Sequence, residues 1–432
     1  MNSSIPMTGF IGLSHLGLVS SICWASFQQN IVGVDVDDRT VSSLNENRLP
    51  IVEPGLEEIF LQHRGKMEFS TDFSLLSECP LVVISRDVPT NEKNESDLSI
   101  LDVLIDRAIP HLKNNATLVL MSQVPVGYSR RLRQRIRDLK PDSSIELIYW
   151  VETLIIGNAV ERCLKPERMI LGVEDAARPL PGGFQIAMER YGCPLLPMIY
   201  ESAELTKTAI NLYLCSSVTY ANTLSDLCEA VGANWSEVVP ALQLDRRIGK
   251  FAYIRPSLGI RGGNLERDLI TLNTLSEKNG VDARFIDTII RYNGDRLNWV
   301  NRKLQKHVFD QSRSPVISIW GLAYKKGTAS TKNSASLQIL DRLQGKAEIR
   351  IYDPVVRLEE PRKGVTAYAD KYEALTGADC LLILTDWEEF QTLDAQAAHE
   401  RMKRPVVIDC VGVLSQSHYE GIVLERMGVS QC

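Results

Sequence analysis

A glycine-containing turn near the start of the chain holds the first residues whose types and spacing could do chemistry. Gly12-Leu13-Ser14-His15-Leu16-Gly17 follows an apolar run of strand length and precedes a helical pattern. In dinucleotide-binding turns, one glycine makes the turn, one lets the backbone approach the pyrophosphate, and one packs the helix against the strand. Ser14 takes the middle place and adds a side chain there. We therefore predict a cofactor site at Gly12, Ser14 and Gly17 in which binding is weakened or shifted.

An acidic residue at a suitable distance supports this interpretation. Asp35 follows Gly12 by 35 − 12 = 23 residues and closes the apolar run that begins at Ile31. A carboxylate at this place accepts hydrogen bonds from the ribose hydroxyls of adenosine and repels a 2′-phosphate. The pattern favours NAD over NADP as the cofactor. A strand–turn–helix corner that binds nothing is the alternative.

The elements that position this turn follow from the hydrophobic pattern. Short apolar runs alternate with helical segments in residues 1–200 and again in 306–432, whereas residues 201–305 contain only helical patterns. Alternation of this kind predicts parallel sheets covered by helices on both faces. We place a linker at Lys306 to Pro315. The predicted strands are 9–12, 31–35, 81–84 and 117–121 in the first domain, and 316–320, 348–352, 380–384 and 406–409 in the last.

Composition excludes several classes of protein. The 432 residues are 44% hydrophobic, which is enough for two or three cores, and 48 basic against 54 acidic residues give a net charge of −6. No global positive field therefore attracts nucleic acid or an anionic membrane. Nine dispersed cysteines without a C-x-x-C pair indicate reduced thiols, and six histidines without ligand spacing give no support for a metal site. The chain also lacks a signal-peptide pattern and an apolar stretch of membrane-spanning length, so we expect a cytoplasmic protein.

Several short motifs, in this order and spacing, resemble the UDP-glucose/GDP-mannose dehydrogenase family of nucleotide-sugar dehydrogenases. The resemblance covers nearly the whole chain. It implies an α/β fold of two Rossmann-like doubly wound domains joined by a helical dimerisation domain. The first domain would bind NAD, the second would form a homodimer, and the third would hold a nucleotide sugar. The motifs are 32–37, 53–56, 124–127, 203–207 with Asn211, 245–249, 321–325, 352–354 and 384–387.

The resemblance also implies catalytic residues. Lys207 and Asn211 stand four residues apart, on one face of a helix. They match the family's active-site lysine, whose ammonium stabilises a developing alkoxide, and the asparagine that orients the alkoxide or a water. Asp268 matches an aspartate that closes the catalytic loop and holds a water. Glu152 matches the first glutamate of the substrate loop.

Other matched residues would contact the ligands. Arg247 matches an arginine that the neighbouring subunit offers to the substrate, and Lys325 matches a lysine near the bound sugar nucleotide. Gly259 and Gly262 belong to the family's glycine-rich loop. Lys332 stands where the family has an arginine that serves cofactor binding.

The catalytic loop departs from the family at its nucleophile. The family sequence G-F-G-G-x-C-F-P-K-D becomes residues 259–268 here, with Asn264 in place of the cysteine. In the family, the thiolate attacks an aldehyde and forms a thioester after a second hydride transfer. The nitrogen lone pair of an amide is delocalised, so Asn264 cannot form a comparable adduct. The thioester route should be closed.

Three functional hypotheses follow. The first is an NAD-dependent dehydrogenase that removes one hydride from a nucleotide sugar or a related polyol and stops at an aldehyde or ketone. The second is a catalytically silent binding or regulatory paralogue. The third is full oxidation to a uronic acid by way of an aldehyde hydrate, with Asp268 or Glu152 as the base. The number of NADH molecules per product separates the first from the third.

Overall fold

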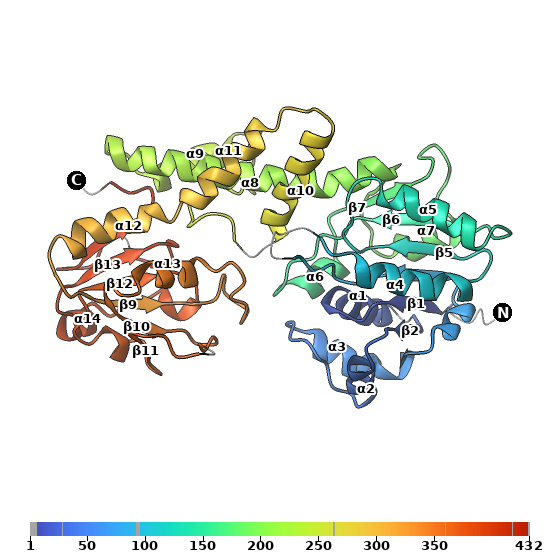
Figure 1. Ribbon diagram of the computed structural model, residues 1–432, viewed down its shortest axis with the longest axis horizontal. Coiled ribbons are helices and arrows are strands. Elements are labelled where there is room, and N and C mark those ends of the chain that lie inside the picture. The colour runs from blue at the N-terminus through green and yellow to red at the C-terminus, as the bar shows by residue number, and fades with distance from the viewer. Residues whose placement is uncertain are drawn as a thin grey trace. The chain divides into compact units, whose positions relative to one another are not determined.

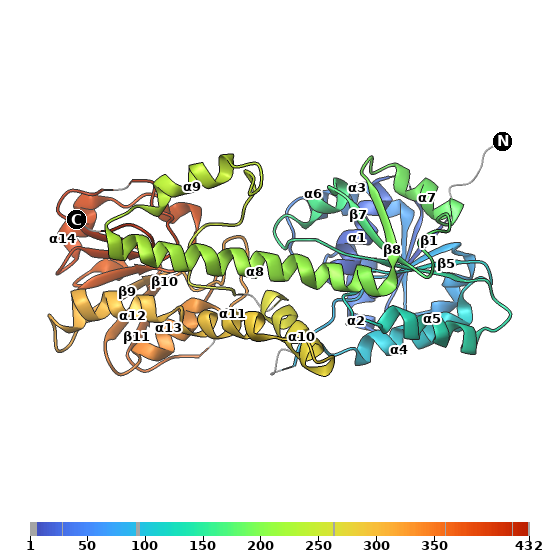
Figure 2. The same cartoon turned by 90° about the horizontal axis from the view of Figure 1, so that it is seen from above.

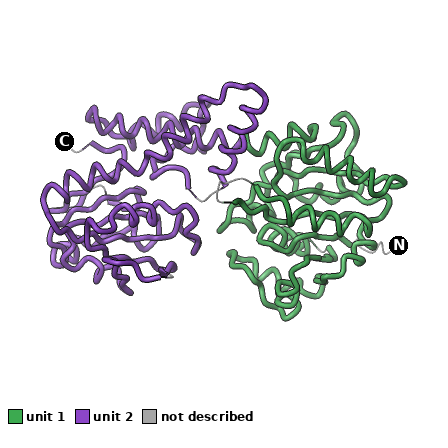
Figure 3. Tube along the Cα trace, viewed as in Figure 1, with its two compact units in different colours: residues 1–209 green, residues 210–432 purple. Residues whose placement is uncertain are grey.

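A computed structural model describes residues 7–27, 29–91, 96–261, 264–358, 360–416 and 418–430. The chain divides into two compact units, residues 1–209 and residues 210–432 (Figure 3). The division falls inside one long helix, α8 (Tyr200–Val231), so this helix contributes to both units. The division into the three domains 1–200, 201–305 and 306–432 expected from the sequence stays a prediction.

The first unit is built on an eight-stranded sheet with the order β3-β2-β1-β4-β5-β6-β7-β8 (Figure 1). All neighbouring strands are parallel except β6 and β7. The strand order reverses between β1 and β4, which is where ligands bind in doubly wound sheets. The strands are β1 (Thr8–Ile11), β2 (Ile31–Val34), β3 (Met67–Ser70), β4 (Leu81–Ile84), β5 (Thr117–Leu120), β6 (Glu146–Trp150), β7 (Met169–Val173) and β8 (Leu195–Ile199).

Helices cover both faces of this sheet. Residues of α1, α3, α6 and α7 share one hydrophobic core, and α4 and α5 lie on the opposite face (Figure 2). Helix α1 is buried from Leu16 to Ala25 because it packs on the sheet and also against α3 and α6. The helices are α1 (His15–Ser26), α2 (Asp38–Asn45), α3 (Leu56–His63), α4 (Ser99–Ala108), α5 (Tyr128–Leu139), α6 (Ala159–Leu164) and α7 (Gly182–Glu189), with 3-10 turns η1 (Arg64–Lys66), η2 (Phe73–Glu78) and η3 (Ile109–His111).

The second unit begins with helices. Cys215 and Val218 of α8 form a small core with residues of α10 and α11. The described part of 201–304 contains no strand, as the sequence predicts. After α8 come α9 (Trp235–Leu244), α10 (Asn264–Lys278), α11 (Arg284–Asp295), α12 (Asn298–Leu304) and the π-helical turn η4 (Gln305–Phe309).

A parallel six-stranded sheet with the order β11-β10-β9-β12-β13-β14 completes the second unit. Its central strands repeat the arrangement of the first sheet, since β9 lies between β10 and β12 as β1 lies between β2 and β4. The elements are β9 (Val316–Trp320), α13 (Ala335–Leu343), β10 (Glu348–Tyr352), β11 (Val365–Ala367), η5 (Glu373–Leu375), β12 (Cys380–Ile383), η6 (Glu388–Phe390), α14 (Ala395–Arg401), β13 (Val406–Asp409) and β14 (Val423–Arg426).

The prediction of a linker at 306–315 is wrong for its first residues, because the π-helical turn η4 extends to Phe309. Lys306 and His307 lie in the π-helical turn η4, and both side chains contact the buried carboxylate of Glu425 on β14. Polar residues near a Ser-Pro pair predict a loop. Instead, the side chains of Lys306 and His307 pair with Glu425 of a much later strand, at a sequence separation of 118 for His307. Tertiary ion pairing thus overrides the local signal.

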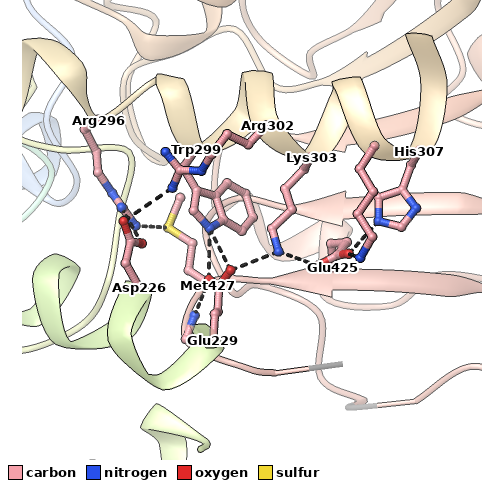
Figure 4. Close-up of polar contacts among 11 residues, drawn as sticks. Asp226, Glu229, Arg296, Trp299, Arg302, Lys303, His307, Glu425 and Met427 are labelled. Carbon is pink, nitrogen blue, oxygen red and sulfur yellow. Dashed lines mark hydrogen bonds and ion pairs between the residues drawn. The ribbon is translucent and has the colours of Figure 1, made fainter. Parts of the chain in front are cut away.

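The same carboxylate belongs to a polar network that joins α8, α12 and β14 (Figure 4). Lys303 donates to Glu425 at 2.7 Å and lies 2.9 Å from Glu229, which also accepts from the indole of Trp299 at 2.9 Å. Arg296 donates to Asp226 at 2.7 Å. Burial raises the pKa of Glu425, but the bonds from Lys303 and His307 outweigh it and lower that pKa overall.

Candidate active site

The first turn has the backbone geometry of a dinucleotide cradle. Gly12 has φ +89°, a conformation that favours glycine, and a Cβ on it would lie 2.8 Å from the Cβ of Arg86. A Cβ on Gly17 would overlap the carbonyl oxygen of Gly12. Helix α1 therefore starts in close contact with the end of β1, with its N-terminal N–H groups at the edge of the sheet. These features fit the pyrophosphate of a dinucleotide.

Asp35 lies at the end of β2, as the sequence suggests, but it is 1% exposed and already holds the turn. Its Oδ2 accepts from the N–H of Leu13 at 2.6 Å, and its Oδ1 accepts from the N–H of Asp37 at 3.1 Å. The guanidinium of Arg86 is 3.4 Å from Oδ2. The ribose-binding role expected for Asp35 stays a prediction.

Ser14 does not cap α1 with its own hydroxyl. Its Oγ accepts from the N–H of Asp87 at 2.8 Å, and the Asp87 carboxylate accepts from the N–H of Leu16 at 2.9 Å. The sequence reading missed Arg86 and Asp87. Their signal is two charged residues almost directly after the fully buried strand β4, beside β1.

Glu53 belongs to the motif 53–56, and its carboxylate organises the segment that contains Glu152. Its buried carboxylate accepts from the N–H groups of Gly157 at 3.0 Å and Ala159 at 2.8 Å, and it lies 2.9 Å from Nε2 of His15. Burial raises the pKa of Glu53, but these bonds outweigh it and lower that pKa overall. One carboxylate therefore links α1 to the start of α6.

Lys207 and Glu152 meet in the first unit. Nζ of Lys207 donates to the backbone carbonyl of Glu152 at 2.7 Å and lies 3.8 Å from its carboxylate. Burial raises the pKa of Glu152, and the lysine opposes this shift. The two side chains are 14% and 18% exposed, so neither is completely buried.

Glu204, three residues before Lys207, has a structural role. Its carboxylate accepts from the N–H of Gly127 at 2.5 Å and of Ser129 at 2.7 Å, which are at the N-terminus of α5. The motif 203–207 and the motif 124–127 therefore bind each other. This capping fixes the rotation of α8 on which Lys207 depends.

Asn211 lies one turn after Lys207 on α8 and donates a hydrogen bond to the carboxylate of Asp268. Asp268 is buried, and the Nε of Arg267 is 3.3 Å from its Oδ1. Asp268 lies inside helix α10 rather than at the end of a loop, and Asn264 is the exposed first residue of that helix. The structure thus joins Asn211 to Asp268 and places Asn264 one turn before Asp268.

The loop before α10 is held by the buried side chains of Asn293 and Arg296. Gly259 has φ +99°, and a Cβ there would overlap the Oδ1 of Asn293. That oxygen accepts from the N–H of Ile260 at 2.6 Å, and the side chain of Arg296 donates to the carbonyl of Ser257 at 2.9 Å. Gly262, predicted as a binding residue, lies outside the described residues.

A cavity of about 340 Å³ in the second unit brings Gly259 and Lys325 together. Its walls come from the loop before α10 and from the ends of β9, β12 and β13. Arg255 donates from this wall to the carbonyl oxygens of Val411 at 2.5 Å and Gly412 at 2.8 Å. The charged residues that line the cavity are Arg255, Arg261, Lys325 and Asp386.

Two charged residues and an amide act on Glu266, which follows the cavity-lining Leu265. Asn333 donates a hydrogen bond to Glu266, which stands in the place of a proline. Burial raises the pKa of Glu266, and the charges of Arg261 and Lys332 oppose this shift. Burial lowers the pKa of Arg261. The exposed Lys332, predicted to serve the cofactor, thus contributes to the field at Glu266.

The second sheet has a turn like the first. Asp353, at the end of β10, accepts from the N–H groups of Leu322 at 2.6 Å and Ala323 at 3.2 Å, and from the indole of Trp387 at 3.2 Å. Gly321 has φ +98° against Thr385. Three of the quoted motifs therefore converge to shape the wall that carries Lys325.

Arg247 does not line the cavity. Its side chain is 89% exposed and pairs with Asp245 at 2.6 Å. In the described ranges, no group of three His, Cys, Asp or Glu residues is placed to hold a metal ion. No helix within them is long and apolar enough to cross a membrane.

Comparison with known proteins identifies the family. Residues 7–182 match the NAD-binding domain of the UDP-glucose/GDP-mannose dehydrogenase family, residues 201–295 its central domain, and residues 318–416 its UDP-binding domain. UDP-glucose 6-dehydrogenase of Rhizobium meliloti (strain 1021) is 30% identical over 411 residues, which cover 92% of this chain and 93% of that protein. The chain belongs to the UDP-glucose/GDP-mannose dehydrogenase family. The predicted family and its NAD-binding domain are confirmed.

Solved structures agree with the fold of this family member. The structure of a UDP-glucose dehydrogenase from Pyrobaculum islandicum superposes with a TM-score of 0.85 at 23% identity and covers 100% of this chain and 99% of that chain. The structure of a UDP-D-ManNAc dehydrogenase from Pyrococcus horikoshii gives 0.83 at 21% identity, covering 98% and 99%. The α/β fold, with two largely parallel sheets and a helical central region, is confirmed.

Proposed function

We propose that this chain oxidises one hydroxyl of a nucleotide sugar by a single hydride transfer and releases an aldehyde or ketone. The observation that carries the proposal is Asn264. It is exposed at the first position of α10, where the family has its cysteine, while the sequence retains Lys207, Asn211 and Asp268, which match the family's residues for the first oxidation. NAD, when bound, supplies the hydride acceptor.

Lys207 and Asn211 would act on the hydroxyl. They lie one turn apart on one face of a single helix. The ammonium of Lys207 would stabilise the alkoxide as the hydroxyl proton leaves through a water held by Asp268. The carbon that carries the alkoxide oxygen would then lose its hydride, and its C–O bond would become a carbonyl. Asn211 would orient the alkoxide through its amide, which Asp268 holds.

The cavity beside Gly259 would take the nucleotide sugar. Lys325, Arg255 and Arg261 bring positive charge to its walls, and the Nε of Arg261 is buried without a hydrogen-bond partner among the described residues. Cationic donors of this kind suit a diphosphate. Arg261 stands where the family loop has a glycine, so the sugar accepted here can differ from glucose.

We also propose a homodimer formed through the helical region. Large apolar side chains are exposed on the described part of α8, including Tyr213 at 64% and Val231 at 67%, and Phe251 after α9 is 88% exposed. Exposed apolar side chains that gather into a patch mark interfaces, and we expect a second copy of this chain to cover these. Arg247 is close to them in sequence and would reach a partner's substrate. Sedimentation of wild type and Tyr213→Glu tests this, since a wild-type monomer contradicts the proposal.

A cytoplasmic location is part of the proposal. Its support is that the eight cysteines in the described part of the chain are free thiols.

The stoichiometry of NADH tests the reaction. Purified full-length protein is incubated with UDP, GDP and dTDP sugars and with free polyols, and NADH and product mass are measured. The proposal expects one NADH per product and a loss of two mass units. Two NADH and an acid would instead favour the hydrate route, with Asp268 or Glu152 as base. No NADH with any substrate, together with no oxidation of NADH in reverse, would favour a silent paralogue.

A further inference from the structure

The segment after β4 reaches the place where doubly wound folds bind the cofactor's phosphates. Strands β1 and β4 are neighbours at the reversal of strand order, and α1 begins at the same edge. The first N–H groups of a helix have no partner inside the helix and attract anions. In this chain one of them is taken, because the Asp87 carboxylate accepts from the N–H of Leu16 at 2.9 Å.

A second bond fixes Asp87 in this position. Its own N–H donates to the hydroxyl of Ser14 at 2.8 Å. Ser14 stands at the fingerprint position where a glycine would offer no side chain. The departure of Ser14 from the fingerprint therefore has a structural partner in Asp87.

Arg86 contacts the part of the cofactor site that would bind the ribose. Its backbone and Cβ lie against Gly12, and its guanidinium is 3.4 Å from Oδ2 of Asp35. Asp35 is the carboxylate that would receive ribose hydroxyls, and the backbone N–H groups of Leu13 and Asp37 also bind it. Neighbouring residues of one segment thus engage the ribose carboxylate and the phosphate-binding helix end.

We infer that Arg86 and Asp87 are an internal occupant of the NAD cradle, which the cofactor must displace in order to bind. The negative pyrophosphate and the Asp87 carboxylate compete for the same helix end, and they repel each other. The ribose competes with Arg86 for Asp35. These two side chains hold NAD affinity low and make cofactor binding depend on a movement of residues 86–87. The inference rests on the NAD-binding domain and not on the proposed reaction.

Binding without turnover tests this. Calorimetric titration of the full chain with NAD and with NADH, in the absence of sugar, gives Kd for wild type, Asp87→Ala, Asp87→Asn and Arg86→Ala. We expect Asp87→Ala to tighten binding about tenfold, a change of about 1.4 kcal/mol, because the competing anion is gone. Asp87→Asn keeps an oxygen acceptor for Leu16 without the charge, so its gain should be smaller. Arg86→Ala should also tighten binding.

A matched control is Asp72→Ala. Asp72 also caps a helical turn of this unit, where it accepts from the N–H of Ser74 at 2.9 Å, and should leave Kd unchanged. Thermal unfolding without ligand confirms that each variant folds. Unchanged or weaker NAD binding in both Asp87 variants would overturn the inference. So would wild-type preference for NADP that Arg86→Ala abolishes, because Arg86 would then be a ligand of the 2′-phosphate.

Discussion

Lys207 and Glu152 form a pair in which the lysine ammonium donates to the glutamate's backbone carbonyl at 2.7 Å while its nitrogen stays 3.8 Å from the carboxylate. Because the closer bond goes to the backbone, the ammonium is positioned without being fully neutralised by the side chain. The raised pKa of Glu152 comes first from burial, and the charge of Asp87 adds to it. The pair therefore offers both a cation and a carboxylate that is easily protonated.

Removal of the cation should stop the proposed oxidation. Lys207→Ala is expected to lower kcat by about 100-fold or more, because a preorganised charge at a developing alkoxide contributes at least this much. NAD binding, measured by calorimetry, should not change. The control is Lys326→Ala on the surface, where the lysine pairs only loosely with Glu388 at 3.7 Å. Equal turnover in wild type and Lys207→Ala would contradict the assignment.

Glu152 should make stability fall as the pH rises. Its pKa is higher in the folded chain than the ordinary value of 4.5, so the folded state holds the proton more tightly than the unfolded state. The folded state is then penalised as the pH rises from 4.5 through the raised pKa. Glu152→Gln stays neutral and should gain stability relative to wild type over this window. Urea unfolding at a series of pH values measures the difference, and a constant difference would contradict the prediction.

The Glu425 network should show the opposite dependence. Since its folded pKa is lowered below 4.5, its contribution is present above the ordinary pKa and is lost as the pH falls through the folded value. Glu425→Gln is expected to cost about 3 kcal/mol at neutral pH, because the partly buried Lys303 loses one of its two carboxylates. The cost should shrink in acid. The control is Glu348→Gln. It removes a carboxylate that is 52% exposed and pairs with Arg350, so it should cost at most about 1 kcal/mol.

Restoring the thiol should change the product. Asn264→Cys places a sulfur at the start of α10, where a helix N-terminus favours the thiolate. We expect the yield to rise from one NADH to two per sugar, with an acid as product and a trapped adduct visible by mass spectrometry. Asn264→Ser, with a weaker nucleophile, is the control and should keep the yield at one. An unchanged yield in the cysteine variant would mean that other pocket departures also block the second stage.

Gly17 should tolerate no side chain. Gly17→Ala would force α1 away from Gly12 and should lower the free energy of unfolding by about 2 kcal/mol or more. NAD binding should weaken with it, because the helix end moves. Gly183→Ala in α7 has open space around its Cβ and should be neutral or slightly stabilising. Thermal unfolding of the two variants gives the comparison, and equal stability would contradict the close approach.

The sequence by itself determined the family, the alternation of strands and helices, and the loss of the cysteine at Asn264. These are local features, since apolar runs such as Val316 to Trp320 are long enough to form strands wherever they pack. The short strand β11 and the strands β3, β6, β7, β8 and β14 were missed because their runs are broken or their patterns ambiguous. Tertiary pairing, which no short window contains, completes both sheets.

Only the tertiary structure decided what the charged residues do. Glu204 resembled part of a catalytic motif and caps α5, whereas Lys306 and His307 resembled a linker and bind a buried glutamate. Asp87, which sequence analysis missed, binds the N-terminal end of α1. A charged side chain acts on whatever the fold brings within about 3 to 4 Å, and that set of neighbours is a property of the folded chain.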